Sequence, residues 1–129
     1  MAALLGTLGV TLTGCGFLGA HDASTHGPDS TGTAHAGPDG GQTIRVVGNE
    51  RMQFVPNVIK AHTGRLRIVL AVTGATPHNL KVPTKHASTG MVQKGKTDSV
   101  EVDLSRPGRY DFLCTYHEQH GMTGVIEVS

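Results

Sequence analysis

The sequence predicts an all-β domain in residues 42–129, folded as a Greek-key sandwich or barrel of about 7–8 strands. Apolar and polar residues alternate along that segment, as they do in strands with one buried face. The composition agrees, because the 129 residues include 18 Gly and no Trp, and only 16% of them are charged. Helical bundles and coiled coils need more charged residues and fewer glycines, so short strands joined by turns are expected.

An apolar run at residues 2–12 precedes this domain. It has the length of a signal-peptide core and is too short to cross a bilayer, which takes about 20 residues. The run ends in Leu12-Thr13-Gly14-Cys15, which resembles the lipobox of bacterial lipoproteins, although no Lys or Arg precedes it. We therefore expect residues 1–18 to form a signal peptide with its lipobox ending at Cys15. The mature chain would be lipid-anchored through Cys15 at the extracytoplasmic face of a bacterial membrane.

Residues 19–41 consist only of Gly, Ala, Ser, Thr, Asp, Pro and His, so they offer little apolar surface to a core. The sequence predicts a flexible tether here. We interpret His21, His26 and His35 as solvated tether residues, with weak metal capture as the alternative.

Charge is distributed unevenly along the chain. All 11 Lys and Arg lie from Arg45 onward, together with seven of the ten Asp and Glu, so residues 42–129 carry +4 and the tether carries −3. A positive domain can be steered toward an acidic partner, although the same balance also serves solubility. No Lys and Arg cluster of the kind that binds phosphate backbones is present, so nucleic-acid binding is excluded as the main role.

The expected strands follow one another at short intervals. In residues 66–72 the even-numbered positions are apolar whereas Arg65 and Arg67 are charged, and residues 100–104 alternate in the same way. Turn signals at 48–49, 62–64 and 106–108 separate the strands. The segment 83–96 shows no period and is expected to be a loop with at most one short edge strand. The full set of expected strands is 44–47, 52–55, 58–61, 66–72, 100–104, 109–114 and 124–128.

Cys114 ends one of these strands. Tyr110, Phe112 and Cys114 share one parity, so the thiol is expected to face the core at the rim of the barrel. If Cys15 is lipidated, Cys114 has no disulfide partner in the chain, and an exported protein must protect that thiol from oxidation. A Cys15–Cys114 disulfide and an inert buried cysteine are the alternatives.

Two further metal-binding side chains follow Cys114, in the pattern C-x2-H-x4-M. They are His117 and Met122. His78, which follows another expected strand, is a candidate fourth ligand. Two imidazoles, one thiolate and a weak axial thioether are the ligands of blue-copper electron-transfer sites. The sequence therefore predicts one copper ion, alternating between Cu(I) and Cu(II), bound by His78, Cys114, His117 and Met122.

These motifs resemble those of the cupredoxins, the single-domain blue-copper proteins. The resemblance covers nearly all of residues 43–129 and rests on the segments 52–56, 78–79, 107–114 and 121–128. It implies the same four ligands, with Asn79 and Thr115 linking the two ligand-bearing loops. It also implies a monomeric one-electron carrier, not an enzyme, that meets redox protein partners transiently where the edge of His117 is exposed.

Two residues depart from the cupredoxin pattern. His120 is an additional imidazole, interpreted as a surface residue, with a Cys/His3 zinc-type site as the alternative. Tyr116 stands where many cupredoxins have Pro, so it either loosens the loop or offers a stacking surface. A copper oxidase is excluded, because no His-x-His pair occurs and Glu118 replaces the second Cys of a binuclear site. Copper storage or delivery remains the alternative function.

Overall fold

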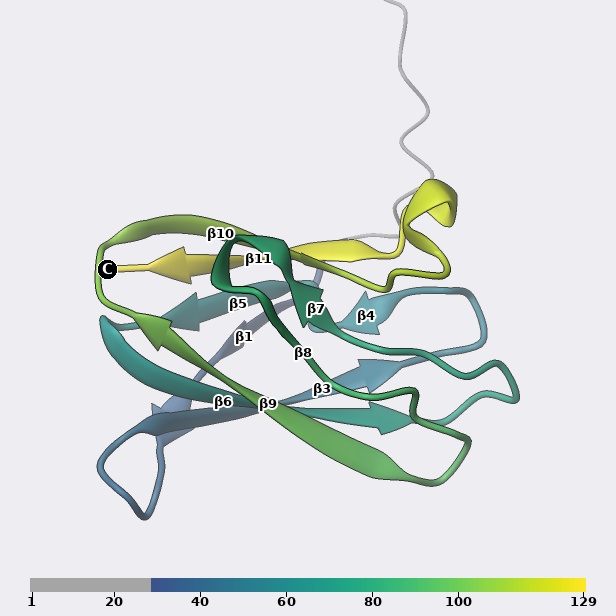
Figure 1. Ribbon diagram of the computed structural model, residues 1–129, viewed down its shortest axis with the longest axis horizontal. Coiled ribbons are helices and arrows are strands. Elements are labelled where there is room, and N and C mark those ends of the chain that lie inside the picture. The colour runs from purple at the N-terminus through teal and green to yellow at the C-terminus, as the bar shows by residue number, and fades with distance from the viewer. Residues whose placement is uncertain (1–28) are drawn as a thin grey trace, which may run out of the picture.

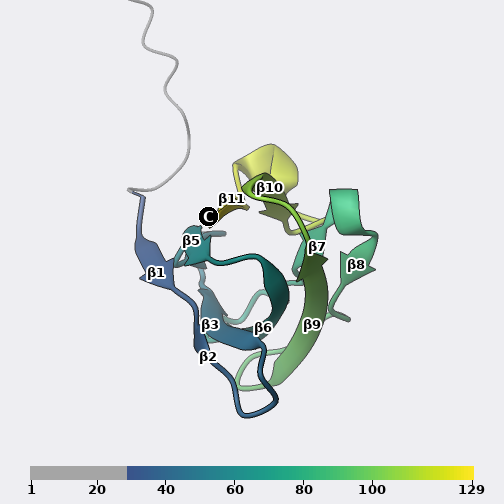
Figure 2. The same ribbon diagram turned by 90° about the vertical axis from the view of Figure 1, so that its left-hand side faces the viewer.

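Two β-sheets face each other in the computed structural model, which describes residues 29–129 (Figure 1). The first sheet has the strand order β1-β5-β11-β10-β7-β8, and the second has the order β2-β3-β6-β9, with β4 paired to β3. Figure 2, a view from one end, shows the sheets curving around a common interior. The elements in chain order are β1 (Thr31–Thr33), β2 (His35–Ala36), β3 (Gln42–Gly48), β4 (Phe54–Val55), β5 (Val58–Ala61), β6 (Gly64–Val72), β7 (Lys81–Val82), the 3-10 helix η1 (Pro83–Lys85), β8 (Ala87–Ser88), β9 (Thr97–Leu104), β10 (Gly108–Leu113), the 3-10 helix η2 (Glu118–His120) and β11 (Thr123–Val128).

This architecture confirms the all-β fold, but with more strands than the sequence predicts. The described residues form 11 strands, and the four without a predicted counterpart are short: β1 has three residues, and β2, β7 and β8 have two each. Alternation becomes visible in a sequence only over about four residues or more, so such short strands leave no pattern. β8 is the short edge strand of the first sheet and lies in the segment 83–96. No helix in the described part of the chain is long and apolar enough to cross a membrane.

β1 and β2 lie in the segment 19–41 that the sequence predicts to be a tether, and for these residues the structure corrects that prediction. β1 runs parallel to β5, with Thr31 opposite Val58, and β2 pairs with β3. Strand pairing uses backbone groups, so it needs no large side chain. At Gly32 a small residue is required, because a Cβ there would lie 2.7 Å from Pro56 Cγ. His35 lies in β2 and is exposed. The predicted signal segment with Cys15, and the tether residues His21 and His26, lie outside the described residues.

The alternation in the sequence places apolar side chains between the two sheets. In β6, Leu66, Ile68 and Leu70 are fully buried, whereas Arg65 and Arg67 are exposed. Phe54 and Phe112 join the sheets toward one end, with ring centroids 5.2 Å apart and the rings tilted by 56°. Apolar burial of this kind is the main favourable term in folding, and it gives the site a rigid base.

Four connections meet at one end of the sandwich, on the right in Figure 1. β3 and β6 are parallel and both end there, while β9, antiparallel to β6, begins there. β10 and β11 are antiparallel with Leu113 opposite Thr123, so residues 114–122 connect them at the same end. The connections 49–53, 73–80, 89–96 and 114–122 therefore lie close together, and all the predicted metal ligands belong to two of them.

Candidate metal centre

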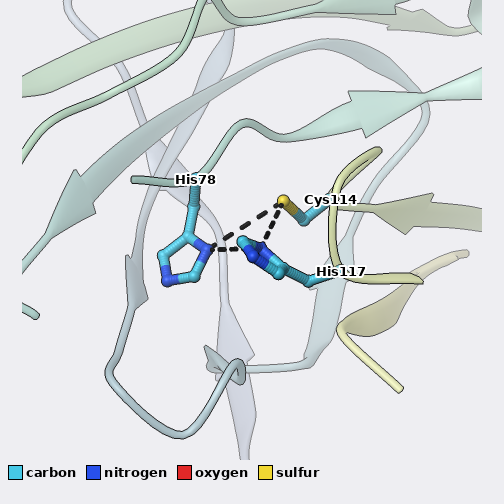
Figure 3. A group of neighbouring side chains, drawn as sticks. All are labelled: His78, Cys114 and His117. Carbon is cyan, nitrogen blue, oxygen red and sulfur yellow. Dashed lines mark hydrogen bonds between the residues drawn. The ribbon is translucent and has the colours of Figure 1, made fainter. Parts of the chain in front are cut away.

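Three side chains from these connections point toward one another (Figure 3). His78 follows β6, Cys114 comes directly after β10, and His117 follows three residues later. The Nδ1 atoms of the two histidines lie 3.1 Å apart. Cys114 Sγ lies 3.4 Å from Nδ1 of His117 and 4.0 Å from Nδ1 of His78. All three ligand atoms are within 4.8 Å of one another.

These separations fit ligands of one shared metal ion. Imidazole nitrogens bind a Zn²⁺-sized ion at about 2.0–2.1 Å and a thiolate sulfur binds it at about 2.3 Å. A nitrogen and a sulfur on one ion therefore lie at most about 4.4 Å apart, and two nitrogens at most about 4.2 Å. The observed 3.1, 3.4 and 4.0 Å are below these limits, so the three donor atoms can reach a common centre without rearrangement.

The group is buried on the protein side and reaches the surface at one residue. His78 and Cys114 are both 0% exposed, whereas His117 is half-buried. A buried imidazole directed at a buried thiol is costly unless both groups are satisfied, and a metal ion satisfies both. His117 is therefore the member of this group that reaches the surface.

The ring of His78 is held from its far side by the end of β3. Its Nε2 lies 2.9 Å from the carbonyl oxygen of Asn49. A carbonyl oxygen only accepts hydrogen bonds, so Nε2 carries the proton, and the lone pair of the neutral ring lies on Nδ1, which faces Cys114 and His117. Burial lowers the pKa of His78; the hydrogen bond to Asn49 opposes this shift, and the neighbouring His117 adds to it. The neutral ring, which is the form that binds metals, is therefore favoured in the folded protein.

Residues 114–122 form the ligand loop, which brings Met122 beside Cys114. The Cys114 N–H donates to the Met122 carbonyl at 3.1 Å, and the Met122 N–H donates to the His117 carbonyl at 3.2 Å. Gly121, with φ 79°, ends η2 in the left-handed region that favours glycine. The Met122 side chain is fully buried in the same apolar cluster as Cys114. Its role as the weak axial ligand stays a prediction.

Asn79 joins the two ligand-bearing connections. Its Oδ1 accepts hydrogen bonds from the backbone N–H of Thr115 at 2.9 Å and from the Thr115 hydroxyl at 3.0 Å. Asn79 follows His78 and Thr115 follows Cys114, so this pair ties together the backbones next to two candidate ligands. Such contacts limit the movement of the ligands relative to each other.

His120 lies outside the group of converging ligands. Its ring centroid is 6.2 Å from that of His117, the residue is exposed, and it does not belong to the set of ligand atoms that lie together. This geometry does not support the zinc-type Cys/His3 alternative. Tyr116, directly before His117, is 65% exposed, so its ring is available at the surface beside the site. Cys114 is a free thiol in the described part of the chain, which does not include Cys15.

Sequence reasoning missed the part that Gly48 and Asn49 play at the site. It identifies them as a turn signal between strands, and nothing local connects them with His78, 29 residues beyond Asn49. The ring of His78 lies directly on Gly48, where a Cβ would be 2.9 Å from the ring Cδ2. Only the parallel pairing of β3 with β6 reveals this contact, because it aligns the ends of the two strands.

Two histidines and a cysteine converge at the end of the sandwich where the four connections meet. This arrangement is typical of a class of small metal-binding β-domains. Comparison with known families is consistent with that class: the profile described as the cupredoxin-like domain matches residues 27–128. The chain therefore belongs to the cupredoxin-like family.

Two individual proteins with a similar sequence or structure share less than a third of their residues with this chain. The chain is 27% identical over 93 residues to the protein named plastocyanin major isoform, chloroplastic, of Arabidopsis thaliana, a match that covers 64% of this chain and 55% of that protein. The chain thus spans about half the length of that curated relative. Among solved structures it is similar to Na-dithionite reduced auracyanin from the photosynthetic bacterium Roseiflexus castenholzii, with a TM-score of 0.58 and 22% identity. That match covers 67% of this chain and 96% of the auracyanin chain, and it supports the fold.

Proposed function

We propose that this protein is a one-electron carrier with a single type 1 copper ion held by His78, Cys114 and His117, with Met122 as a weak axial ligand. The observation that carries the proposal is the convergence of two imidazole nitrogens and one thiol sulfur within 4.8 Å. Thiolate and imidazole ligands with a long axial thioether are typical of blue-copper sites. Copper bound there would supply reversible one-electron chemistry, with no substrate transformed.

The protein side chains have separate roles in this proposal. Cys114 and His78 bind from the buried side, where apolar neighbours exclude water. The hydrogen bonds from Thr115 to Asn79 keep the two ligand-bearing connections together when the charge of the centre changes. His117 is half-buried and gives electrons the shortest route to the surface. A rigid ligand set lowers the rearrangement that accompanies each transfer.

A visible absorption spectrum is the first test. Protein loaded with Cu(II) is expected to be intensely coloured by charge transfer from the Cys114 thiolate, and Cys114→Ser should lose that colour. Cys15→Ala is the matched control, because it removes the other cysteine of the chain and should leave the spectrum unchanged. A colourless protein that binds zinc tightly and copper weakly would refute the proposal.

Copper storage or delivery is the second candidate, and the electron self-exchange rate separates it from a carrier. A carrier needs nearly matched ligand positions in its two oxidation states, whereas a store needs only affinity. We expect fast exchange, seen as NMR line broadening in mixtures of reduced and oxidised protein. Slow exchange, or loss of copper on reduction, would favour delivery.

We further propose that the carrier is exported and anchored by a lipid on Cys15, at the extracytoplasmic face of a bacterial membrane. The support is the Leu12-Thr13-Gly14-Cys15 motif after an apolar run. Several acyl chains on one Cys give stable anchoring, since each buried methylene contributes about 0.8 kcal/mol. The full-length chain should appear in the membrane fraction of a bacterial host, and Cys15→Ala should release it. Identical soluble fractionation of both forms would contradict the anchor.

The proposed partners are other redox proteins. The protein, as a monomer, would bind them transiently at the end of the sandwich that carries residues 114–122. The positive charge of residues 42–129 supports an acidic partner surface. Exchange with such a partner should slow as salt is added, because screening shortens the range of attraction. A rate that does not change between low and high salt would contradict electrostatic steering.

A further inference from the structure

Gly48 and Asn49, at the end of β3, contact the His78 ring although neither belongs to the ligand set. Nε2 of His78 donates to the Asn49 carbonyl at 2.9 Å. A Cβ on Gly48 would lie 2.9 Å from Cδ2 and 3.4 Å from Cγ of the same ring, so the ring lies directly on the backbone. The position of this backbone therefore sets the position of the imidazole.

The side chain of Asn49 holds the turn of that backbone with three hydrogen bonds, beside a backbone bond from the Met52 N–H to the Asn49 carbonyl at 3.3 Å. Its Oδ1 accepts hydrogen bonds from the N–H groups of Arg51 at 3.0 Å and Gln53 at 3.1 Å. Its Nδ2 donates to Gln53 Oε1 at 3.4 Å, and its own N–H donates to the Gln53 carbonyl at 3.1 Å. These contacts close the connection 49–53 around one residue, and they orient the peptide whose carbonyl faces His78.

The same connection is fixed against the segment that carries His78. The Thr73 N–H donates to the Gly48 carbonyl at 3.2 Å. A Cβ on Gly74 would lie 2.9 Å from the Glu50 nitrogen, so the two connections pack backbone against backbone. Met52 adopts φ 57°, a left-handed conformation that a non-glycine residue keeps only when its surroundings demand it. The connection 49–53 is thus a rigid support and not a loosely attached turn.

We propose that Asn49 is a positioning residue for the metal ligand His78. Its side chain holds its own carbonyl against the Nε2–H of His78, which selects the tautomer that offers Nδ1 to the metal and fixes where Nδ1 lies. The inference rests on the proposed function for the identity of the metal, but the tautomer itself is a property of the metal-free protein. An acceptor on the far nitrogen also raises the basicity of a histidine ligand.

The first experiment uses the metal-free protein, full chain, labelled with ¹⁵N. Long-range ¹H–¹⁵N NMR spectra of the imidazoles report which nitrogen carries the proton. The wild type should show His78 as a single Nε2–H tautomer with a slowly exchanging proton. A proton on Nδ1, or an even mixture of tautomers, would overturn the proposal without any variant being needed.

The second experiment compares three variants in the copper-loaded protein. Asn49→Ala removes the acceptor of both loop N–H groups, Asn49→Asp keeps an oxygen at that place, and Arg51→Ala changes an exposed side chain of the same connection. We expect Asn49→Ala to weaken Cu(II) binding about 10- to 100-fold, the range found when such a supporting contact is lost. Its reduction potential should rise, because a less basic ligand stabilises Cu(II) less. Asn49→Asp should recover most of the affinity, and Arg51→Ala should behave like the wild type.

The outcomes separate this inference from the proposed function. Wild-type affinity and potential in Asn49→Ala would overturn the positioning role, as would equal losses in Asn49→Ala and Asn49→Asp or in Arg51→Ala. If Asn49→Ala does not fold, the comparison of Asn49→Asp with Arg51→Ala and the wild-type NMR spectrum decide the matter. If the wild type fails to bind copper while His78 is a single Nε2–H tautomer that becomes mixed in Asn49→Ala, the proposed function fails and the positioning role stands.

Discussion

A methyl group added at Gly48 should disturb the metal centre more than it disturbs the fold. In Gly48→Ala the new Cβ would lie 2.9 Å from His78 Cδ2, nearer than Cβ atoms come to other heavy atoms in folded proteins. Regaining an ordinary contact of about 3.4 Å requires the ring to move by about 0.5 Å. Ligand distances in metal sites vary by only about 0.2 Å, so a shift of that size takes Nδ1 out of range.

The expected cost in stability is modest. Overpacking by one methylene costs about 1–3 kcal/mol, and Gly→Ala recovers about 0.4–1 kcal/mol by restricting the unfolded chain. The free energy of unfolding of the metal-free protein should therefore fall by at most about 2.6 kcal/mol. The copper dissociation constant should rise by about tenfold or more, because the displaced ring also strains its hydrogen bond to Asn49.

Competition titration with a copper chelator measures the affinity, and urea unfolding of the metal-free protein measures the stability. Gly90→Ala is the matched control: it lies in another connection at the same end, and its Cβ would meet no atom closer than 3.6 Å. Wild-type affinity in Gly48→Ala, or an equal loss in Gly90→Ala, would refute the reasoning that the His78 ring depends on close contact with this backbone.

Met122→Gln is expected to keep copper and most of the colour while voltammetry shows a changed potential, because the axial ligand tunes it; loss of copper would mean that Met122 is not a weak ligand. His117→Gly should hold copper that added imidazole can reach, and stopped-flow electron exchange with partner proteins should fall sharply; an unchanged rate would exclude His117 as the exit. Asn79→Ala should lower the free energy of unfolding by about 1–3 kcal/mol in urea, because the N–H of Thr115 loses its acceptor; unchanged stability would contradict this. Burial lowers the pKa of His78, so on acidification this histidine is protonated in the unfolded chain at a higher pH than in the folded protein. The metal-free protein should therefore lose stability as the pH falls below 6.5. His78→Gln should lose that part of the pH dependence, and an identical pH profile in both proteins would count against it.

Much of the metal centre is predictable because its ligands lie close together in the chain or follow a strand. Cys114 and His117 are three residues apart, and the parity of Phe112 and Cys114 along β10 turns the thiol inward. His78 is a candidate ligand from the sequence because it follows an expected strand, but no local pattern sets the distance of 36 residues between it and Cys114, so its place beside the other ligands rests on the resemblance. The structure brings the three together because β6 and β10 both end at one end of the sandwich.

The sequence by itself determined the fold class and the ligand types, because strand periodicity and metal chemistry depend on residues a few positions apart. Tertiary structure alone decided that residues 31–33 and 35–36 form strands, since their pairing uses backbone groups that composition does not reveal. It also decided which nitrogen of His78 faces Cys114 and His117, because the proton on the other nitrogen bonds to Asn49 across 29 residues. Contacts of this kind depend on the register between β3 and β6, and a register is a property of two paired strands that neither segment specifies alone.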